Sequence, residues 1–141
     1  MFFLLDSNVV SELIRRVRNP AVVSWVASSP LEDLYFSAVA EAQLRYAAAI
    51  LPVGRRRQTL LTNIEEMLRE AFGDRVLPFD RAAAREYADI AAVRRSTGRP
   101  VAPVDCQVAA IARSRGMTVV TRNVRDFEDI GVDIFDPWTV N

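Results

Sequence analysis

The chain begins with an uninterrupted run of apolar residues, which ends abruptly at the charged Asp6. A short, continuously apolar run of this kind is typical of a strand that is buried on both faces, as in a parallel sheet covered by helices. Asp6 then lies at the carboxyl end of that strand, which is the edge where open α/β sheets bind their ligands. The first six residues therefore predict a fold class and the edge of the sheet at which a functional site should lie.

The rest of the chain alternates between strand-like and helical patterns, an order that builds a parallel sheet with helices on both faces. The expected strands are residues 2–5, 33–36, 76–79, 118–121 and 133–135. The expected helices are residues 8–17, 20–28, 38–51, 56–72, 81–96 and 105–115, with a short turn near 124–129. A chain of 141 residues, 50% of them hydrophobic, can bury one good core, so we expect a single α/β domain over residues 1–141.

The composition excludes several classes of enzyme. The chain has no histidine and no lysine, and all 18 of its basic residues are arginines. Histidine-based serine, cysteine and ribonuclease mechanisms, imidazole zinc sites and lysine Schiff-base chemistry are therefore excluded. The 18 acidic residues balance the arginines, so no overall positive field attracts nucleic acid. Arginine clusters at 15–18, 55–57 and 94–99 leave local phosphate contacts open, although solvated helix ends are the simpler interpretation of each.

The single cysteine, Cys106, allows no disulfide framework, and no apolar stretch approaches the ~20 residues that a membrane span requires. The N-terminus also lacks a signal-type segment, so we expect a cytoplasmic protein with no membrane partner. Without a neighbouring histidine or lysine to activate its thiol, Cys106 is expected to be a small buried hydrophobe rather than a nucleophile.

Three aspartates occupy comparable positions in the alternating pattern. Asp6 follows the first strand, Asp105 opens the helix at 105–115, and Asp126 comes shortly after the strand at 118–121. Acidic side chains that converge on one edge of a sheet repel one another unless a cation holds them. Mg²⁺ and Mn²⁺ prefer anionic oxygen ligands, so the pattern predicts a hard-metal site. Taken alone, each aspartate has a simpler interpretation as a helix cap or a turn residue.

The helix expected at 38–51 carries one stripe at helical spacing that we predict to face inward: Val39, Gln43, Tyr46, Ala47 and Ile50. Gln43 is the only strongly polar member of this stripe. Its amide should therefore make a hydrogen bond in the core or point into a polar pocket. Glu41 lies about 200° round the helix from Gln43. We expect it to be a solvated structural residue that pairs with Arg45, in a helix capped by Ser37.

Three short segments resemble the signature segments of PIN domains, and in particular those of the VapC-type and FitB-type toxins of bacterial toxin–antitoxin pairs. They are LLDSNVVSE at residues 4–12, PVDCQVAAIA at 103–112 and VVTRNVRDF at 119–127. The resemblance continues through LPFD at 77–80 to FDPW at 135–138, so it runs the whole length of the chain. It implies a three-layer α/β/α sandwich with a central parallel sheet, which agrees with the alternation of strands and helices.

The resemblance also implies an activity, which is metal-dependent endoribonuclease cleavage, often of tRNA or rRNA, held off by a cognate antitoxin of the VapB or FitA type. Asp6, Asp105 and Asp126 would hold one or two Mg²⁺ or Mn²⁺ ions. Asn8 and Thr121 match polar positions that support the family's site. The family further implies a homodimer, and contact with operator DNA only through the antitoxin.

Two positions depart from the family pattern. Some members have a further aspartate where this chain has Asn123, so the fourth acidic position is shared between Asn123 and Asp126. Family members normally carry glutamate where this chain has Gln43. By this resemblance, the predicted catalytic set consists of Asp6, Gln43, Asp105 and Asp126. A neutral amide still offers an oxygen, but it removes one negative charge and cannot act as a general base. Two explanations compete for Gln43: a substitution that disarms a toxic nuclease, or a natural member of weak activity.

The sequence thus favours a Mg²⁺- or Mn²⁺-dependent endoribonuclease toxin that Gln43 weakens or inactivates. The alternative is a catalytically silent module that binds its antitoxin and co-represses at operator DNA. A receiver-like phospho-acceptor domain is disfavoured, because that class needs a lysine near its acyl phosphate and this chain has none.

Overall fold

A computed structural model describes residues 1–139 of the chain and contains the predicted parallel sheet. Within that range the five strands are β1 (Phe3–Leu5), β2 (Leu34–Ser37), β3 (Val76–Leu77), β4 (Thr118–Val120) and β5 (Ile134–Phe135). They lie in the order β3-β2-β1-β4-β5, and every neighbouring pair is parallel. β1 is therefore the central strand, and Asp6 follows directly where it ends.

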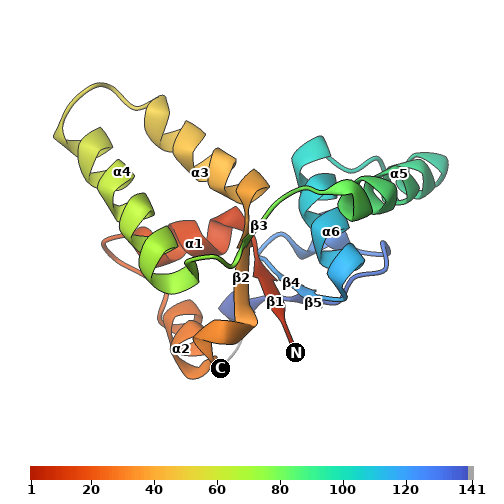
Figure 1. The fold of residues 1–141 in the computed structure, drawn as a ribbon, viewed down its shortest axis with the longest axis horizontal. Coiled ribbons are helices and arrows are strands. Elements are labelled where there is room, and N and C mark those ends of the chain that lie inside the picture. The colour runs from red at the N-terminus through yellow and green to blue at the C-terminus, as the bar shows by residue number, and fades with distance from the viewer. Residues whose placement is uncertain (140–141) are drawn as a thin grey trace.

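The six α-helices found within residues 1–139 are α1 (Ser7–Ile14), α2 (Pro20–Ser28), α3 (Ala38–Ala49), α4 (Arg55–Met67), α5 (Arg81–Ser96) and α6 (Pro103–Arg115). Helices α5 and α6 pack together on one face of the sheet, and α1 to α4 lie on the other (Figure 1). A π-helical turn, Leu68–Phe72, extends α4, and a 3-10 helix, Val124–Phe127, carries Asp126. The predicted three-layer α/β/α arrangement is confirmed. In the described part of the chain, no helix is both long and apolar enough to span a membrane.

The apolar run at the N-terminus is continuous because both faces of β1 are covered. Leu4 belongs to the core cluster formed with α5 and α6, whereas the next residue, Leu5, belongs to the cluster formed with α1, α3 and α4. Val119 and Val120 of the neighbouring strand β4 divide between the same two clusters. All four side chains are fully buried. Since successive side chains of a strand point to opposite faces, two covered faces require this uninterrupted pattern.

The helix ends follow local chemistry. The Ser37 hydroxyl accepts a hydrogen bond from the Ala40 N–H at 3.0 Å and caps α3, as predicted. Helix α6 begins at Pro103 rather than at residue 105, because proline suits the first position of a helix. Asp105 is consequently a residue of the first helical turn and not a cap. Helix α1 ends at Ile14 rather than at residue 17, because Arg15 takes up an extended backbone.

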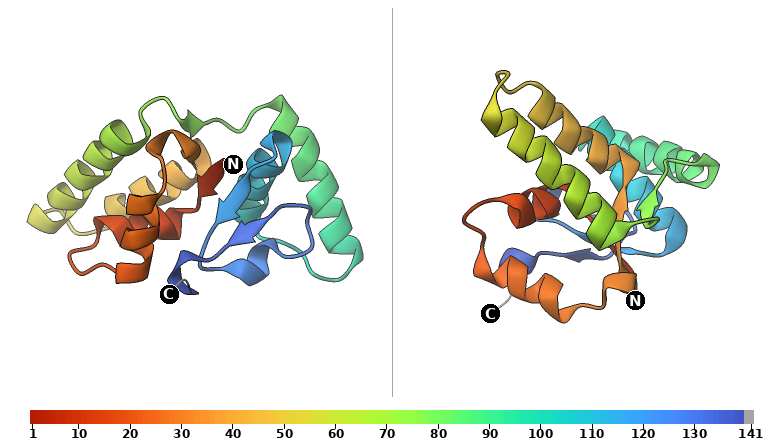
Figure 2. Two further views of the ribbon diagram at one scale, coloured as in Figure 1. Left: turned by 90° about the horizontal axis from the view of Figure 1, so that it is seen from below. Right: turned by 60° about the vertical axis from the view of Figure 1, so that its left-hand side comes forward.

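The predicted inward stripe of α3 is wrong. The buried face of this helix consists of Ala40, Leu44 and Ala48, whereas Tyr46 and Ile50 are 68% and 64% exposed. Of the other predicted members, Ala47 is exposed, and two are half-buried, Val39 and Gln43. The two buried alanines explain the difference, because small side chains let the helix approach its neighbours closely. The end of α3 then extends beyond the sheet alongside α4 (Figures 1 and 2), which leaves its large side chains in solvent.

Candidate functional site

Asp6 is held in one position by the ends of two strands. It is only 4% exposed, and its backbone N–H donates to the Val120 carbonyl at 2.9 Å. One carboxylate oxygen, Oδ1, accepts the Ser7 N–H at 2.8 Å at the start of α1. The other, Oδ2, accepts the Thr121 hydroxyl at 2.9 Å. The predicted acid at the end of β1 is therefore fixed by partners from α1 and from the end of β4.

The predicted supporting residues surround Asp6. The Asn8 amide nitrogen donates to the Thr121 hydroxyl oxygen at 3.2 Å and to Asp6 Oδ2 at 3.4 Å. The Asn123 N–H donates to the same hydroxyl oxygen at 3.0 Å. Asn8 and Thr121 thus contribute side chains to the network, whereas Asn123 enters it through its backbone and has an exposed side chain. The Asn8 amide oxygen accepts the backbone N–H of Arg122 at 3.4 Å. Arg122, the residue after Thr121, is thereby connected to the same network.

Asp105 and Asp126 lie close enough to Asp6 for their charges to act on one another. Burial, followed by the negative charges of Asp6 and Asp126, raises the pKa of Asp105 to about 6. Burial also raises the pKa of Asp6, against hydrogen bonds from Thr121 and Ser7, and the charge of Asp126 adds to the rise. The fold therefore places the three predicted aspartates near enough for their charges to interact. The further acidic position, shared in prediction between Asn123 and Asp126, stays a prediction.

Within residues 1–139, no positive side chain forms an ion pair with this acid cluster of Asp6, Asp105 and Asp126. Over the same residues, no three His, Cys, Asp or Glu side chains converge closely enough to enclose a metal ion. Like charges with no counter-ion between them are expected to stand apart. The donor set itself, anionic carboxylate oxygens without nitrogen or sulfur, fits a hard divalent cation.

Gln43 adds an oxygen without a partner. Its side-chain Oε1 is shielded from solvent and accepts no hydrogen bond, and no other buried side-chain nitrogen or oxygen in residues 1–139 lacks a partner. Helix α3, which carries Gln43, packs against α1 and α6, the two helices that begin at Asp6 and carry Asp105. An unpaired buried oxygen costs about 1–3 kcal/mol, so it calls for an explanation. A bound ligand would supply one, and the residues present therefore fit a cation.

Two other sequence predictions are confirmed as structural features. Arg45 Nε donates to Glu41 at 2.7 Å on the same helix, and its Nη1 lies 2.6 Å from Glu65 of α4. Cys106 is buried, its thiol donates to the Tyr87 carbonyl at 3.8 Å, and burial raises its pKa. Neither Glu41 nor Cys106 therefore needs a role in catalysis.

The sequence patterns missed a second polar site beside the first. Glu12 is only 5% exposed, and its carboxylate accepts Arg15 Nη1 at 3.1 Å and the Asn19 N–H at 2.9 Å. The Arg122 guanidinium lies over the Trp138 ring, 5.3 Å from its centre. These residues line one cavity of about 280 Å³. The cluster at 15–18 and the arginine directly after Thr121 were the signals that could have located it.

An acid cluster at the carboxyl edge of a parallel five-stranded sheet, inside an α/β/α sandwich, defines a protein of the PIN-like class. The comparison with protein families agrees: the model described as PIN domain matches residues 3–133. The chain belongs to the PIN domain family.

Several curated proteins are similar to this chain over nearly its whole length. The chain is 42% identical to the plasmid stability protein StbB of Pseudomonas syringae, over 96% of this chain and 97% of that protein. It is 39% identical to the VapC ribonuclease Y4jK of Sinorhizobium fredii, with 96% of each chain covered. It is 38% identical to the toxin FitB of Neisseria gonorrhoeae, over 96% of this chain and 97% of the toxin.

Two solved structures share the fold closely. A chain of FitAB bound to the IR36 DNA fragment superposes with a TM-score of 0.91 at 37% identity, covering 99% of this chain and 98% of that one. A chain of DNA-bound VapBC from Salmonella typhimurium superposes with a TM-score of 0.80 at 28% identity, covering 97% and 98%. The predicted likeness to VapC-type and FitB-type proteins is confirmed.

Proposed function

We propose that this chain is a Mg²⁺- or Mn²⁺-dependent endoribonuclease toxin of a toxin–antitoxin pair. The observation that carries the proposal is the cluster of Asp6, Asp105 and Asp126 at the carboxyl edge of the sheet, which no ion pair within residues 1–139 neutralises. Family membership supports it, since similar proteins include a VapC ribonuclease and the toxin FitB.

The chain's own residues have distinct tasks in this proposal. Asp6, Asp105 and Asp126 would hold the metal, which when bound polarises the phosphate and lowers the pKa of the attacking water. Thr121 and the Ser7 N–H keep the Asp6 carboxylate in one orientation through bonds of 2.9 and 2.8 Å. With a pKa of about 6, Asp105 is mostly ionised at neutral pH and available as a ligand.

Gln43 sets the expected strength of the activity. Its buried Oε1 has no hydrogen-bond partner, so it is free to face a cation as a neutral oxygen. An amide brings no charge to the metal and cannot accept a proton from water. Cleavage is therefore expected to be weak or absent with Gln43, and stronger when glutamate restores the fourth charge.

The test is Mg²⁺-dependent cleavage of a labelled RNA pool by the chain freed of antitoxin. Gln43→Glu should cleave faster than the unsubstituted chain, and Asp6→Asn and Asp105→Asn in that variant should abolish cleavage. Asp80→Asn is the matched control, because Asp80 caps α5 away from the cluster and asparagine caps a helix as well as aspartate does. Unchanged cleavage after both Asp6→Asn and Asp105→Asn would refute the proposal.

A catalytically silent module is the second candidate, and Gln43 is the observation that favours it. In that case the chain acts by binding its antitoxin and co-repressing at operator DNA. A stable antitoxin complex combined with no RNA cleavage, even after Gln43→Glu, would select this function over the nuclease.

We also propose a cognate antitoxin of the VapB or FitA type as the partner, with operator DNA contacted only through it. The support is the likeness to FitAB and VapBC, which are both toxin–antitoxin complexes bound to DNA. The RNA substrate is expected to be tRNA or rRNA.

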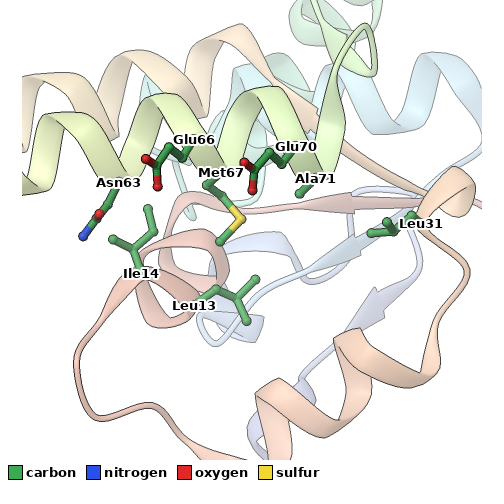
Figure 3. A pocket seen from close by; sticks show the side chains of 8 residues that line it. All are labelled: Leu13, Ile14, Leu31, Asn63, Glu66, Met67, Glu70 and Ala71. Carbon is green, nitrogen blue, oxygen red and sulfur yellow. The ribbon is translucent and has the colours of Figure 1, made fainter.

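A groove between α1 and α4 has the shape and charge for such a partner (Figure 3). Two cavities, of about 410 and 750 Å³, meet here because both are lined by Ile14 and Asn63. The first has Glu66 and Glu70 on its wall, and the second is rimmed by arginines: Arg15, Arg16, Arg55 and Arg56. An amphipathic antitoxin segment with acids towards one end and bases towards the other would complement both walls.

A homodimer is proposed on separate grounds. Tyr46, Ile50 and Val53 are large apolar side chains that are exposed together near the end of α3 and the turn after it. A second copy of the chain would bury them. Light scattering of the free protein should give the mass of a dimer, and a monomer that persists at high concentration would contradict it.

A further inference from the structure

We propose that the cavity lined by Glu12, Arg15, Arg18, Arg122 and Trp138 binds the backbone of the RNA strand next to the acid cluster, as a substrate subsite. This inference rests on the proposed ribonuclease function and assigns a second contact to the same substrate. It separates the residues that grip the strand from the aspartates that act on it.

The cavity adjoins the acid cluster through the chain itself. Arg122 directly follows Thr121, whose hydroxyl donates to Asp6 at 2.9 Å, and consecutive Cα atoms are about 3.8 Å apart. The Arg122 N–H also donates to the Asn8 amide oxygen at 3.4 Å. A strand whose phosphate lies at the aspartates can therefore place a neighbouring phosphate in this cavity.

The charge of the cavity suits a phosphodiester. Three arginines line it together with one acid, Glu12. That acid is buried, and its two oxygens are already occupied by Arg15 Nη1 at 3.1 Å and the Asn19 N–H at 2.9 Å. Arg18 and Arg122 form no ion pair within residues 1–139. The cavity thus keeps a positive surplus in a chain with no net charge, and a guanidinium fork matches phosphate geometry.

An aromatic surface distinguishes an RNA strand from an acidic peptide as the ligand. Trp138 is half-buried, and the flat guanidinium of Arg122 lies over its ring, 5.3 Å from the ring centre. Unpaired bases stack on tryptophan rings and on arginine planes. A site for single-stranded RNA combines arginines that bind phosphate with a surface on which bases stack. A peptide carboxylate needs only the arginines.

The test is RNA binding without cleavage, measured by fluorescence anisotropy with a labelled single-stranded RNA in EDTA over a series of salt concentrations. Arg18→Ala should weaken binding about fivefold and lower the slope of log K against log salt by about 0.7, since one phosphate contact is lost. Arg85→Ala is the control, because Arg85 is an exposed arginine of α5 that lines neither this cavity nor the groove. It should leave both quantities unchanged.

A second variant tests the stacking surface. Arg122→Lys keeps the charge but loses the plane over Trp138. Affinity for RNA should fall while the salt slope stays the same. In the cleavage assay of the Gln43→Glu protein, Arg18→Ala and Arg122→Lys should raise KM and leave kcat unchanged, because neither touches the reacting atoms.

The possible results distinguish a failure of the RNA subsite from a failure of the proposed nuclease function. Equal salt slopes for Arg18→Ala and Arg85→Ala overturn the subsite. Weaker binding to the antitoxin without weaker binding to RNA also overturns it, because the cavity is then a protein contact. RNA binding with the expected change of slope, but no cleavage even after Gln43→Glu, keeps the subsite and refutes the nuclease. If the unsubstituted chain binds no RNA, both fall.

Discussion

The net charge of the proposed site depends on the side chain at residue 43, because the three aspartates supply its other charges. The amide oxygen of Gln43 is buried without a partner, while the aspartates repel one another without a counter-ion. In the proposed site, where residue 43 faces that cluster, a glutamate would add a fourth negative charge, which is unfavourable without metal and favourable with it. The sign of its effect on stability should therefore depend on metal.

The prediction is that Gln43→Glu lowers the stability of the free chain by about 1 kcal/mol in EDTA. With Mg²⁺ at about 100 times its dissociation constant, the same variant should gain about 2.7 kcal/mol. Thermal unfolding in EDTA and in Mg²⁺ measures both effects. Gln58→Glu, at an exposed position on α4, provides the control. An equal response of both variants to Mg²⁺ would contradict a metal site at residue 43.

Asp105 gives a pH dependence with a defined sign. Its pKa is raised from 3.8 to about 6 in the folded chain, mainly by burial. Between these two values the unfolded chain loses the proton first, so without metal the stability should fall as pH rises through this window and level off above it. Asp105→Asn removes the effect. Because Asp105 is partly exposed, the expected difference is only about 1 kcal/mol.

Unfolding in EDTA at a series of pH values, compared between the unsubstituted chain and Asp105→Asn, measures this difference directly. The two stability curves should separate as pH rises towards about 6, the folded pKa of Asp105, with the variant the more stable. Parallel curves would mean that neither burial nor the charges of Asp6 and Asp126 raise the pKa of Asp105 in the folded chain.

Among the secondary-structure elements, α3 positions Gln43 and depends on its cap. The buried Ser37 hydroxyl accepts the Ala40 N–H at 3.0 Å, so Ser37→Ala should cost about 1 kcal/mol. Asp80→Ala removes the equivalent cap of α5 and should cost a similar amount. Since α5 carries no predicted site residue, only Ser37→Ala should also reduce the gain in melting temperature that Mg²⁺ gives to Gln43→Glu. Identical Mg²⁺ responses in the two cap variants would contradict this role of α3.

The same helix explains which parts of the fold the sequence could and could not predict. The strands were predictable because a buried parallel strand needs a continuous apolar run. The inward face of α3 was not, because two stripes share the same helical spacing and only packing selects one. The alanines at 40 and 48 let α3 pack closely against its neighbours. With that face buried, the Tyr46 side chain points into solvent. Periodicity predicts that a helix has a buried face, whereas tertiary contacts decide which of its residues form that face.

The site divides in the same way. The position of Asp6 was predictable, because the parallel strands end at one edge of the sheet, which is the edge where open α/β sheets bind their ligands. Glu12 was not, because its burial depends on the turn at Asn19 and on Arg15, which no local pattern specifies. The pairing of Asp6 with Thr121, 115 positions apart, likewise depends on β4 lying beside β1.

At the scale of the whole molecule, the sheet order separates two kinds of surface. Asp6 lies at the carboxyl end of the central strand β1. The groove lies between α1 and α4 on one face of the sheet (Figure 3). Helix α1 connects them, because it begins directly after its N-cap Asp6 and ends at Ile14 in the groove. An antitoxin held in the groove can therefore extend along α1 to the acid cluster, which would couple complex formation to inhibition.

This arrangement predicts that a charge in the groove disrupts the antitoxin complex without changing the site. Ile14 lines both cavities, so Ile14→Glu would bury an unpaired carboxylate under the bound segment. Affinity for the purified antitoxin, measured by calorimetry, should fall at least tenfold, since a central apolar contact is worth about 2 kcal/mol. Val93→Glu, at an exposed position of α5 outside the groove, should leave it unchanged. RNA binding by the antitoxin-free chain should be the same in both variants. An Ile14→Glu protein that binds antitoxin normally would show that the partner docks elsewhere.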